Sequence, residues 1–481
     1  MKALMSPSRT LILFYLLSGT LCLGQTISLS PKMGPPTTRT VISGNGFTPN
    51  ASIRISFDGT KLTMAKTDAS GSFSNVSIPV PATALPGRHR VTAAVAGDGS
   101  RAQTFFLVRT DWSQFRFNPD HSGFNPYENV LNSSSVGGMQ IKWSYTTGGS
   151  VESSPAVVNG VAYVGSEDRH VYALNADTGT LLWSYSTADM VTSSPAVVNG
   201  VVYVASVDGN VYALDSATGH LVWNYSSGQR AAQYILGGVS SSPVVANGLV
   251  YFGSPDGTMY ALQADTGSVQ WAFQTSTSIT SSPAVVNGAV YFAAFDYNFY
   301  ALNATTGEQL WSYPIGGWTY SSAAVTNGVV YVGSESRGVL ALDVSSGALL
   351  WTYIDAQYTE TDASPAVANG VVYGGSQAHN LYALNAASGE LVWTYNLGNS
   401  LIGSPVVANG LIYAAPLYYR LQVLDANTGS LLWQYSILEG WCWSSPAVVN
   451  GTVYIGWGDK LYAFGLPKSV NPAPLRDELK P

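Results

Sequence analysis

The sequence predicts an all-β protein in which an eight-bladed β-propeller follows a small β-sandwich. A tryptophan recurs eight times, at spacings of 40, 40, 48, 40, 40, 42 and 40 residues. Each repeat carries four short apolar or alternating runs, which is typical of a four-stranded propeller blade. The stretch 25–109 lies outside the repeat, and its alternating runs and turn signals predict an antiparallel sandwich. The repeat tryptophans are Trp143, Trp183, Trp223, Trp271, Trp311, Trp351, Trp393 and Trp433.

The first complete repeat shows the elements expected of every blade. Its strands A to D are predicted at 156–158, 161–164, 171–174 and 181–185. Asn159-Gly160 joins strands A and B, and this dipeptide tolerates positive φ at both centres of a type I′ turn. A second turn ending at Gly179 leads into strand D. Strands A and B are almost entirely apolar, so we expect them to be buried between neighbouring blades.

The two ends of the repeat region complement each other. The last unit leaves the pattern at Pro467 without a strand D, and the first tryptophan, Trp143, has no strands A to C before it. We therefore expect 141–145 to form the outermost strand of the last blade. That arrangement gives eight complete blades and leaves no sheet edge open at the seam.

The chain is expected to be exported in two domains. Residues 1–24 resemble a signal peptide, with Lys2 and Arg9 before an apolar stretch and a plausible cleavage site before Gln25. An uncleaved N-terminal anchor stays open as the alternative; after cleavage no membrane span is expected. The sandwich at 25–109, the propeller at 110–467 and a flexible Pro-rich tail at 468–481 complete the organisation.

Charge and cysteine content narrow the classes of partner. The chain has 21 basic and 28 acidic residues, and removal of the signal leaves a formal net charge of −9. No basic run is present, so nucleic acid and anionic membranes are not expected as partners. Cys442 would be the only cysteine of the mature chain, which excludes an internal disulfide.

The spacing Ala173-x-Asn175-x-x-Thr178-Gly179-x-x-x-Trp183 recurs along the chain. It resembles the tryptophan-docking repeat of PQQ-like, quinoprotein-type propellers, a group that includes BamB-type assembly factors. The resemblance spans 112–465 and implies that the repeat indoles are scaffold, each filling the gap between two blades. The runs 41–47 and 67–73 resemble IPT/TIG modules, which implies a spacer or a binding platform.

The resemblance leaves cofactor use open, because such propellers include both quinone dehydrogenases and cofactor-free scaffolds. The dehydrogenases are characterised by two adjacent cysteines beside the quinone, carboxylate and amide ligands to calcium, and an Asp base. Here Cys442 lies between Trp441 and Trp443, so the cysteine pair is absent. We expect no cofactor, with PQQ and calcium as the alternative. No two of the five histidines have metal-ligand spacing, so no metal site is expected.

The repeat also predicts where a binding site would lie. The A–B and C–D turns hardly vary between blades and share one face, whereas the B–C and D–A connections vary and share the other. Specificity is expected on this variable face. Its candidate binding residues are aromatic: Phe295, Tyr297, Trp318, Tyr320, Tyr358, Tyr418, Tyr419, Trp441, Trp443 and Trp457. The alternative is that they fill the channel or pack together.

Acidic residues accompany these aromatics and are interpreted as a solvated rim: Asp296, Asp355, Glu360, Asp362, Glu439 and Asp459. The sequence therefore favours a non-catalytic binding or scaffold protein that is secreted, periplasmic or on the cell surface. Its variable face would meet a protein or a glycan. The alternatives are a PQQ-dependent dehydrogenase, or a hydrolase or lyase using acids such as Asp296 and Asp362, although no spacing singles out a carboxylate pair.

Overall fold

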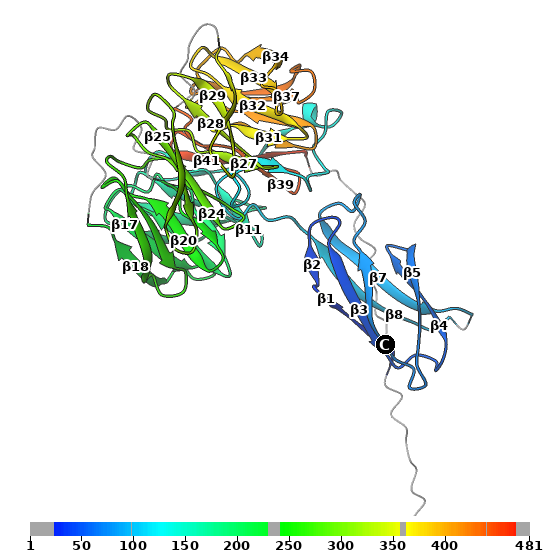
Figure 1. Cartoon of the computed structure of the whole chain (residues 1–481). Helices are drawn as coiled ribbons and strands as arrows, with labels where there is room; N and C mark the ends of the chain where they lie inside the picture. The colour runs from blue at the N-terminus through cyan, green and yellow to red at the C-terminus, as the bar shows by residue number, and fades with distance from the viewer. Residues whose placement is uncertain (1–23, 98, 229–240, 356–361, 439, 468–481) are drawn as a thin grey trace, which may run out of the picture. The chain divides into compact units, whose positions relative to one another are not determined.

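The computed structural model describes residues 24–97, 99–228, 241–355, 362–438 and 440–467 (Figure 1). Within these ranges the protein is all-β, as predicted, apart from one 3-10 turn, η1 (Val136–Gly138). Contacts divide the chain into two compact units, Met1–Val108 and Arg109–Pro481. The predicted signal, except Gly24, and the predicted tail lie outside the described residues. None of the described segments is a helix with the length and apolarity to span a membrane.

The first unit is a β-sandwich of a three-stranded and a five-stranded sheet, in the orders β1-β3-β6 and β2-β8-β7-β4-β5. Alternate residues of its strands point inward, and Ile42, Ile53 and Phe106 are fully buried between the sheets. Its strands are β1 (Thr26–Ser30), β2 (Met33–Gly34), β3 (Arg39–Asn45), β4 (Ser52–Phe57), β5 (Thr60–Lys66), β6 (Phe73–Pro79), β7 (Gly87–Val95) and β8 (Arg101–Val108).

The second unit is built from antiparallel blades, and in seven of them four strands that follow one another in the chain lie side by side (Figure 1). The first four blades are β11 (Ala156–Val158), β12 (Val161–Ser166), β13 (His170–Asn175), β14 (Leu181–Ser186); β15 (Ala196–Val198), β16 (Val201–Ala205), β17 (Asn210–Asp215), β18 (Leu221–Ser226); β19 (Val244–Ala246), β20 (Leu249–Gly253), β21 (Thr258–Gln263), β22 (Val269–Gln274); and β23 (Ala284–Val286), β24 (Ala289–Ala293), β25 (Asn298–Asn303), β26 (Gln309–Pro314).

Blades 5 to 7 follow the same plan, and the short β9 (Phe124–Asn125) adds to blade 7 in parallel with its innermost strand. Their strands are β27 (Ala324–Thr326), β28 (Val329–Ser334), β29 (Gly338–Asp343), β30 (Leu349–Tyr353); β31 (Ala366–Ala368), β32 (Val371–Gly375), β33 (Asn380–Asn385), β34 (Leu391–Asn396); and β35 (Val406–Ala408), β36 (Leu411–Ala414), β37 (Tyr419–Asp425), β38 (Leu431–Ile437).

The eighth blade closes the ring with strands from both ends of the propeller, as predicted. It consists of β39 (Ala447–Val449), β40 (Thr452–Trp457), β41 (Lys460–Gly465) and β10 (Gln140–Thr146). β10 pairs with β41 and sets Trp143 opposite Ala463. The innermost strands contact their neighbours all the way round, and β11 meets both β15 and β39. Among the described residues the propeller is therefore a closed ring of eight blades.

The predicted A–B turns are confirmed by their backbone. All eight asparagines have φ between 48° and 54°, and the glycines that follow have φ between 72° and 81°. Positive φ at both central residues defines the type I′ turn, whose twist matches that of the flanking strands. Asn-Gly therefore recurs in every blade because few other pairs of residues adopt this conformation without strain.

The repeat tryptophans join each blade to the next, as the resemblance implied. The indole Nε1 of Trp183 donates to the Ser216 carbonyl oxygen of the following blade at 3.0 Å, and six further tryptophans make the same bond at 2.9–3.1 Å. The indole also packs on the glycine of the next C–D turn. Trp433 differs: it packs on Phe464 at 5.8 Å, because the last unit ends before such a turn.

A second set of bonds joins the blades close to the channel. The backbone N–H of Ser154 donates to Ser194 Oγ at 2.9 Å, and each ring serine repeats this bond to the next. Ser445 N–H closes the circle on Ser154 Oγ at 2.9 Å. We call these residues the serine ring: Ser154, Ser194, Ser242, Ser282, Ser322, Ser364, Ser404 and Ser445.

A pair of glycines in blade 4 tests the docking of the indoles. Both Gly307 and Gly288 have positive φ, 76° and 80°, but a Cβ on Gly307 would lie 2.7 Å from the Trp271 ring whereas Gly288 has open space. Gly288→Ala is expected to cost about 1 kcal/mol of unfolding free energy from backbone strain alone. Gly307→Ala is expected to cost about 2 kcal/mol more, because the indole must shift. Chemical denaturation measures both; equal losses would contradict the docking.

Candidate functional site

The segment 112–125 lies inside the channel and contacts every blade. Carbonyl oxygens of the segment accept the N–H of the middle residue of each inner strand in six blades, at 2.7–2.9 Å. Gln114 Oε1 accepts the Val245 N–H in blade 3, and Asn125 Nδ2 donates to the Val448 carbonyl in blade 8. We call this segment the plug. The six bonded pairs are Trp112–Val157, Ser113–Val197, Pro119–Val285, Asp120–Val325, Ser122–Val367 and Gly123–Val407.

Arg116 fastens the plug to the wall of the channel. Its guanidinium is buried and donates to the carbonyl oxygens of His121, Ser364 and Pro365. Burial lowers the pKa of Arg116 to about 9, which leaves the side chain charged at neutral pH. Its bonds to backbone oxygens offset part of the cost of burying a cation.

Above the plug, the channel opens into a cavity of about 480 Å³ that we call the cup. Phe115 of the plug and all eight serines of the ring line it, from Ser154 in blade 1 to Ser445 in blade 8. The remaining lining comes from the B–C and D–A connections, so the cup belongs to the variable face. A smaller cavity of about 290 Å³ lies on the other side, between plug residues such as Phe117 and the A–B turns at Asn327 and Asn369.

The cup is acidic. Glu152, Glu335 and Asp362 line it, and none of its described lining residues is Lys or Arg. Gln377 Nε2 donates to Asp362 Oδ2 at 2.7 Å. Burial raises the pKa of Tyr320, and the charges of Asp362 and Glu335 raise it further, so both carboxylates act on the same phenol. Such a lining attracts positively charged groups and repels anions.

On the opposite side of the cup, Glu152 forms a carboxyl pair with Glu167. Burial, the Glu167 charge and a hydrogen bond between the two groups raise the pKa of Glu152 to about 7. Burial also raises the pKa of Glu167. Two carboxyl groups that share one proton in this way carry a single negative charge, whereas two separate carboxylates would carry two.

Two polar groups of the cup have no hydrogen-bond partner among the described residues. The Thr280 hydroxyl is buried and unpaired, and so is the Trp443 indole Nε1. Both residues line the cup. A buried donor without a partner costs about 1–3 kcal/mol, so a ligand with acceptor atoms would gain by satisfying these groups.

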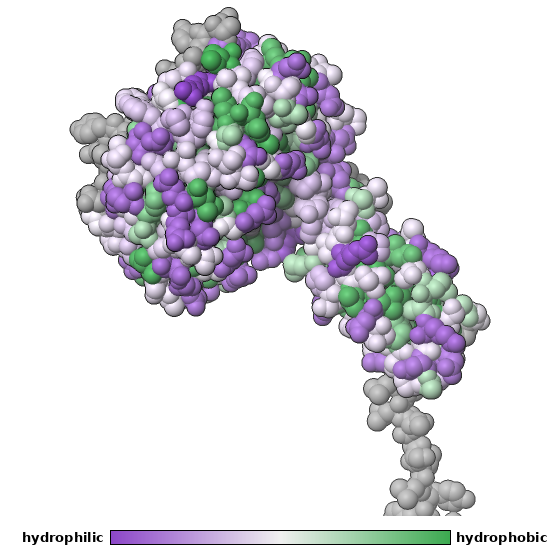
Figure 2. All heavy atoms as spheres, viewed as in Figure 1, coloured by the Kyte–Doolittle hydropathy of each residue, from purple (hydrophilic) through white to green (hydrophobic). Residues whose placement is uncertain are grey.

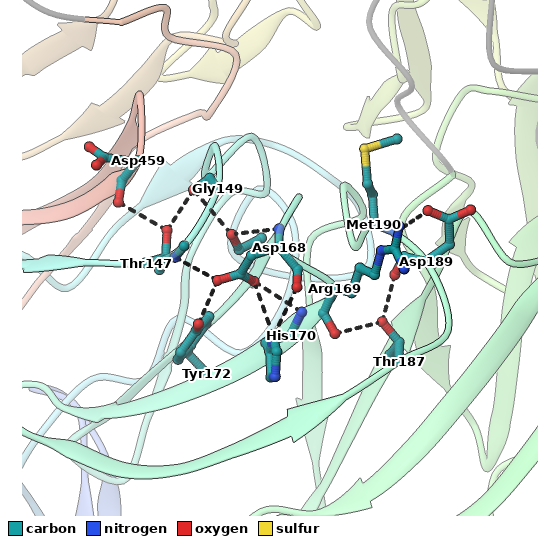
Figure 3. Close-up of polar contacts among 12 residues, drawn as sticks. Thr147, Gly149, Asp168, Arg169, His170, Tyr172, Thr187, Asp189, Met190 and Asp459 are labelled. Atoms are coloured by element: carbon teal, nitrogen blue, oxygen red, sulfur yellow. Dashed lines mark hydrogen bonds and ion pairs between the residues drawn. The ribbon is translucent and has the colours of Figure 1, made fainter.

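Blades 1 to 4 close their part of the variable face with an Asp–Tyr bond. The Tyr172 hydroxyl donates to Asp168 Oδ2 at 2.6 Å, and the Gly148 N–H donates to the same oxygen (Figure 3). Tyr212–Asp208, Tyr260–Asp256 and Tyr300–Asp296 repeat the Tyr–Asp bond at 2.7, 3.2 and 2.7 Å. These carboxylates fix loops. Asp296 is thus tied to Tyr300 and is not a freely solvated rim residue.

The threonines beside these bonds tie neighbouring connections together. The Thr187 hydroxyl donates to the carbonyl oxygens of Arg169 and Asp189, at 3.0 and 2.6 Å (Figure 3). Thr147 does the same with Gly149 and Asp459. The variable face in this part of the ring is therefore held by internal bonds, and its polar groups are largely occupied.

The predicted aromatic candidates form two groups, one at blades 4 and 5 and the other at blades 7 and 8. In the first, Trp318 stacks on Phe295 and Tyr297 at 6.3 and 6.5 Å, and Tyr320 meets Phe295 edge-on at 5.3 Å. Trp318 is 49% exposed, and it lines the mouth of the cup together with Tyr320. In the second group, Tyr418 packs on Tyr419 at 5.6 Å and meets Trp441 edge-on at 6.4 Å.

One of the candidates lies elsewhere than expected. Trp457 was expected in an exposed connection, but β40 extends through it, its side chain is 1% exposed and its Nε1 donates to the Gly440 carbonyl. That expectation is wrong, because the residue is part of the core. Trp443 is half-buried and lines the cup. Tyr358, together with Glu360 and Glu439, lies outside the described residues.

Most of the cup's wall comes from a single position of the repeat, which the sequence analysis did not identify. The residue two places before each ring serine is Glu152, Thr192, Thr280, Tyr320, Asp362, Ile402 or Trp443 in seven of the blades, and all seven line the cup. Aligning the units on that serine would have revealed them. The plug had no such signal, because its bonds use mainly backbone carbonyls.

The residues of the cup do not fit PQQ, the cofactor that the fold suggests. PQQ carries three carboxylates, and the cup offers carboxylates with no Lys or Arg among its described lining. Cys442 is fully buried, and burial raises the pKa of its thiol. In the described parts of the chain, no three His, Cys, Asp or Glu residues are grouped as a metal site would require.

Comparison with known families settles the class of propeller. The family model described as "Outer membrane protein assembly factor BamB", PQQ_2, matches residues 137–353 and 350–466. The chain belongs to this propeller family. A second model, the IPT/TIG domain, matches 25–107 in the sandwich. No curated protein matches the chain significantly in sequence.

Solved structures share the fold of this BamB-family chain at low identity. Quinohemoprotein alcohol dehydrogenase from Comamonas testosteroni superimposes with a TM-score of 0.63 at 16% identity, covering 75% of this chain and 81% of that one. A europium-containing methanol dehydrogenase gives 0.64 at 16%, covering 74% and 98%. BamB from Moraxella catarrhalis gives 0.58 at 17%, covering 69% and 99%. At these identities the likeness shows the fold alone.

The carboxyl pair predicts a pH dependence of stability. Because the pKa of Glu152 rises from its ordinary 4.5 to about 7 on folding, the folded state retains a proton that the unfolded state loses. The contribution of Glu152 to the unfolding free energy therefore falls as pH rises from about 4.5 to 7. Glu152→Gln should flatten this decline in denaturation curves recorded from pH 4.5 to 8. The exposed control Glu308→Gln should leave the slope unchanged; an unchanged slope in Glu152→Gln would refute the pair.

Proposed function

We propose that this chain is an exported, non-catalytic binding protein that holds a segment of a protein partner at the mouth of the cup. The observation that carries the proposal is the cup itself: a blind, acidic cavity with exposed aromatics at its mouth, on a ring whose opposite face repeats the same turns. Membership of the BamB family supports a protein as the partner, and the predicted signal at 1–24 supports export.

The lining favours binding over catalysis. Its described residues include no histidine or lysine that could activate a serine hydroxyl. The ring serines already accept hydrogen bonds from neighbouring backbone N–H groups, so their hydroxyls serve the scaffold. Glu152 lies in blade 1, whereas Glu335 and Asp362 lie in blades 5 and 6.

The chemistry of the cup suggests what the partner presents. Asp362 and Glu335 with Trp318 and Tyr320 combine negative charge and aromatic faces, which suits a lysine or arginine side chain. The unpaired donors of Thr280 and Trp443 suit the carbonyl oxygens of the peptide that carries it. The partner segment is therefore basic and extended.

Affinity capture from the envelope fraction of the source organism tests the proposal. Wild-type protein should retain a discrete partner protein; Trp318→Ala and the double variant Glu335→Gln/Asp362→Asn should each lower its recovery at least about tenfold, as expected of central interface residues. Leu182→Ala is the matched control, since Leu182 is 51% exposed on β14, away from the cup. Equal recovery with all variants would place any binding elsewhere and refute the proposal.

A further inference from the structure

Four arginines lie together on one face of the sandwich's five-stranded sheet. They are Arg54 on β4, Arg88 and Arg90 on β7, and Arg101 on β8. Arg88 and Arg90 are two residues apart in one strand and therefore point to the same side. All four are exposed and line one shallow concavity of about 550 Å³. Figure 2 shows patches of strongly hydrophilic side chains on the surface of this unit.

The positive charge of this face is not balanced by nearby acids. Among the described residues, Asp58 is the only acidic one that lines the concavity, and its carboxylate is used by the His89 ring at 2.6 Å and by the Arg90 backbone N–H at 2.8 Å. None of the four guanidinium groups forms an ion pair within the described residues. Clustering like charges on a sheet is unfavourable, and a bound anion would relieve the repulsion.

The two units carry charge of opposite sign. Residues 25–108 contain eight basic and three acidic residues, a formal charge of +5, whereas 109–467 contain eight basic and 23 acidic residues, a formal charge of −15. The negative net charge of the whole chain therefore gives no indication that residues 25–108 are basic. The lack of a basic run is equally uninformative, since strand alternation places Arg88 and Arg90 on one face with His89 between them.

We propose that this arginine face binds an acidic polysaccharide, independently of the propeller's partner. Each guanidinium can bind a carboxylate or sulfate through two parallel hydrogen bonds, and their spread over three strands matches a polymer with repeated charges. Thr92 and Gln103 lie in the same concavity and offer hydrogen bonds to sugar hydroxyls.

The face suits sugars better than nucleic acid. Phe105 is the only aromatic residue in the described lining of the concavity, and the Arg88 guanidinium covers its ring at 4.3 Å from the centroid. Base stacking, which carries much of single-strand binding, therefore lacks an open platform here.

Calorimetric titration of the full chain with polygalacturonate, at 50 and at 200 mM NaCl, tests the proposal. Arg90→Gln/Arg101→Gln should weaken binding about tenfold or more and reduce its dependence on salt, because two charge-assisted contacts are lost. Lys32→Gln/Arg39→Gln removes the same charge from other parts of the sandwich and should weaken binding less than about twofold. Thermal unfolding checks that both double variants remain folded.

Comparison ligands separate the remaining outcomes. Neutral dextran should not bind. Absence of polygalacturonate binding, or equal weakening in both double variants, would overturn the proposal. So would equally tight binding of single-stranded DNA or of phosphatidylglycerol vesicles, since the face would then be a general polyanion surface. The experiment does not involve the cup, so its failure leaves the proposed function standing.

Discussion

The serine ring is the constraint on which the propeller depends. Each ring serine gives one backbone N–H to its neighbour on one side and receives one on its hydroxyl from the other, so a complete set of bonds exists only when the circle is closed. Each bond contributes about 1 kcal/mol, but each also satisfies a buried N–H that would otherwise cost more. The circle therefore favours a whole ring over an open one. It also fixes seven described residues, each two places before a ring serine, as a wall around the channel.

The blades are similar, but the plug and the Asp–Tyr bonds make the two faces and the two halves of the ring different, so that the cup is left as a single open site. The plug fills the channel and separates the cup from the cavity among the A–B turns. In blades 1 to 4 the aspartates of the B–C turns are bound to tyrosine hydroxyls. Blades 5 to 7 have Ser336, Ala378 and Tyr418 at the corresponding position, so this bond is missing there. Glu335 and Asp362 of the cup belong to this less constrained side, and Trp318 and Tyr320 lie in the connection that leads into it.

Features that depend on local sequence could be predicted, and those that depend on distant contacts could not. The Asn-Gly turns, the strands of each blade and the closing role of β10 follow from φ preferences, alternation and repeat arithmetic. The plug could not be predicted, because its hydrogen-bond partners lie up to hundreds of residues away in the chain, as in the Gly123–Val407 pair. Trp457 was expected in a connection because strand B of the first blade was predicted to end at 164, whereas both β12 and β40 extend two residues beyond the corresponding position. The arginine face could not be predicted, because its four residues are separated in the sequence and only the pairing of β4, β7 and β8 brings them together.

Site-specific photo-crosslinking in the source organism tests most directly whether recognition belongs to the variable face. A photoreactive amino acid would replace Trp318 at the mouth of the cup or, in a second strain, the exposed Thr305 in a C–D turn of the constant face. Irradiation is expected to yield a discrete protein adduct from position 318 and none from position 305. An adduct from position 305 alone, or equal adducts from both positions, would contradict the account.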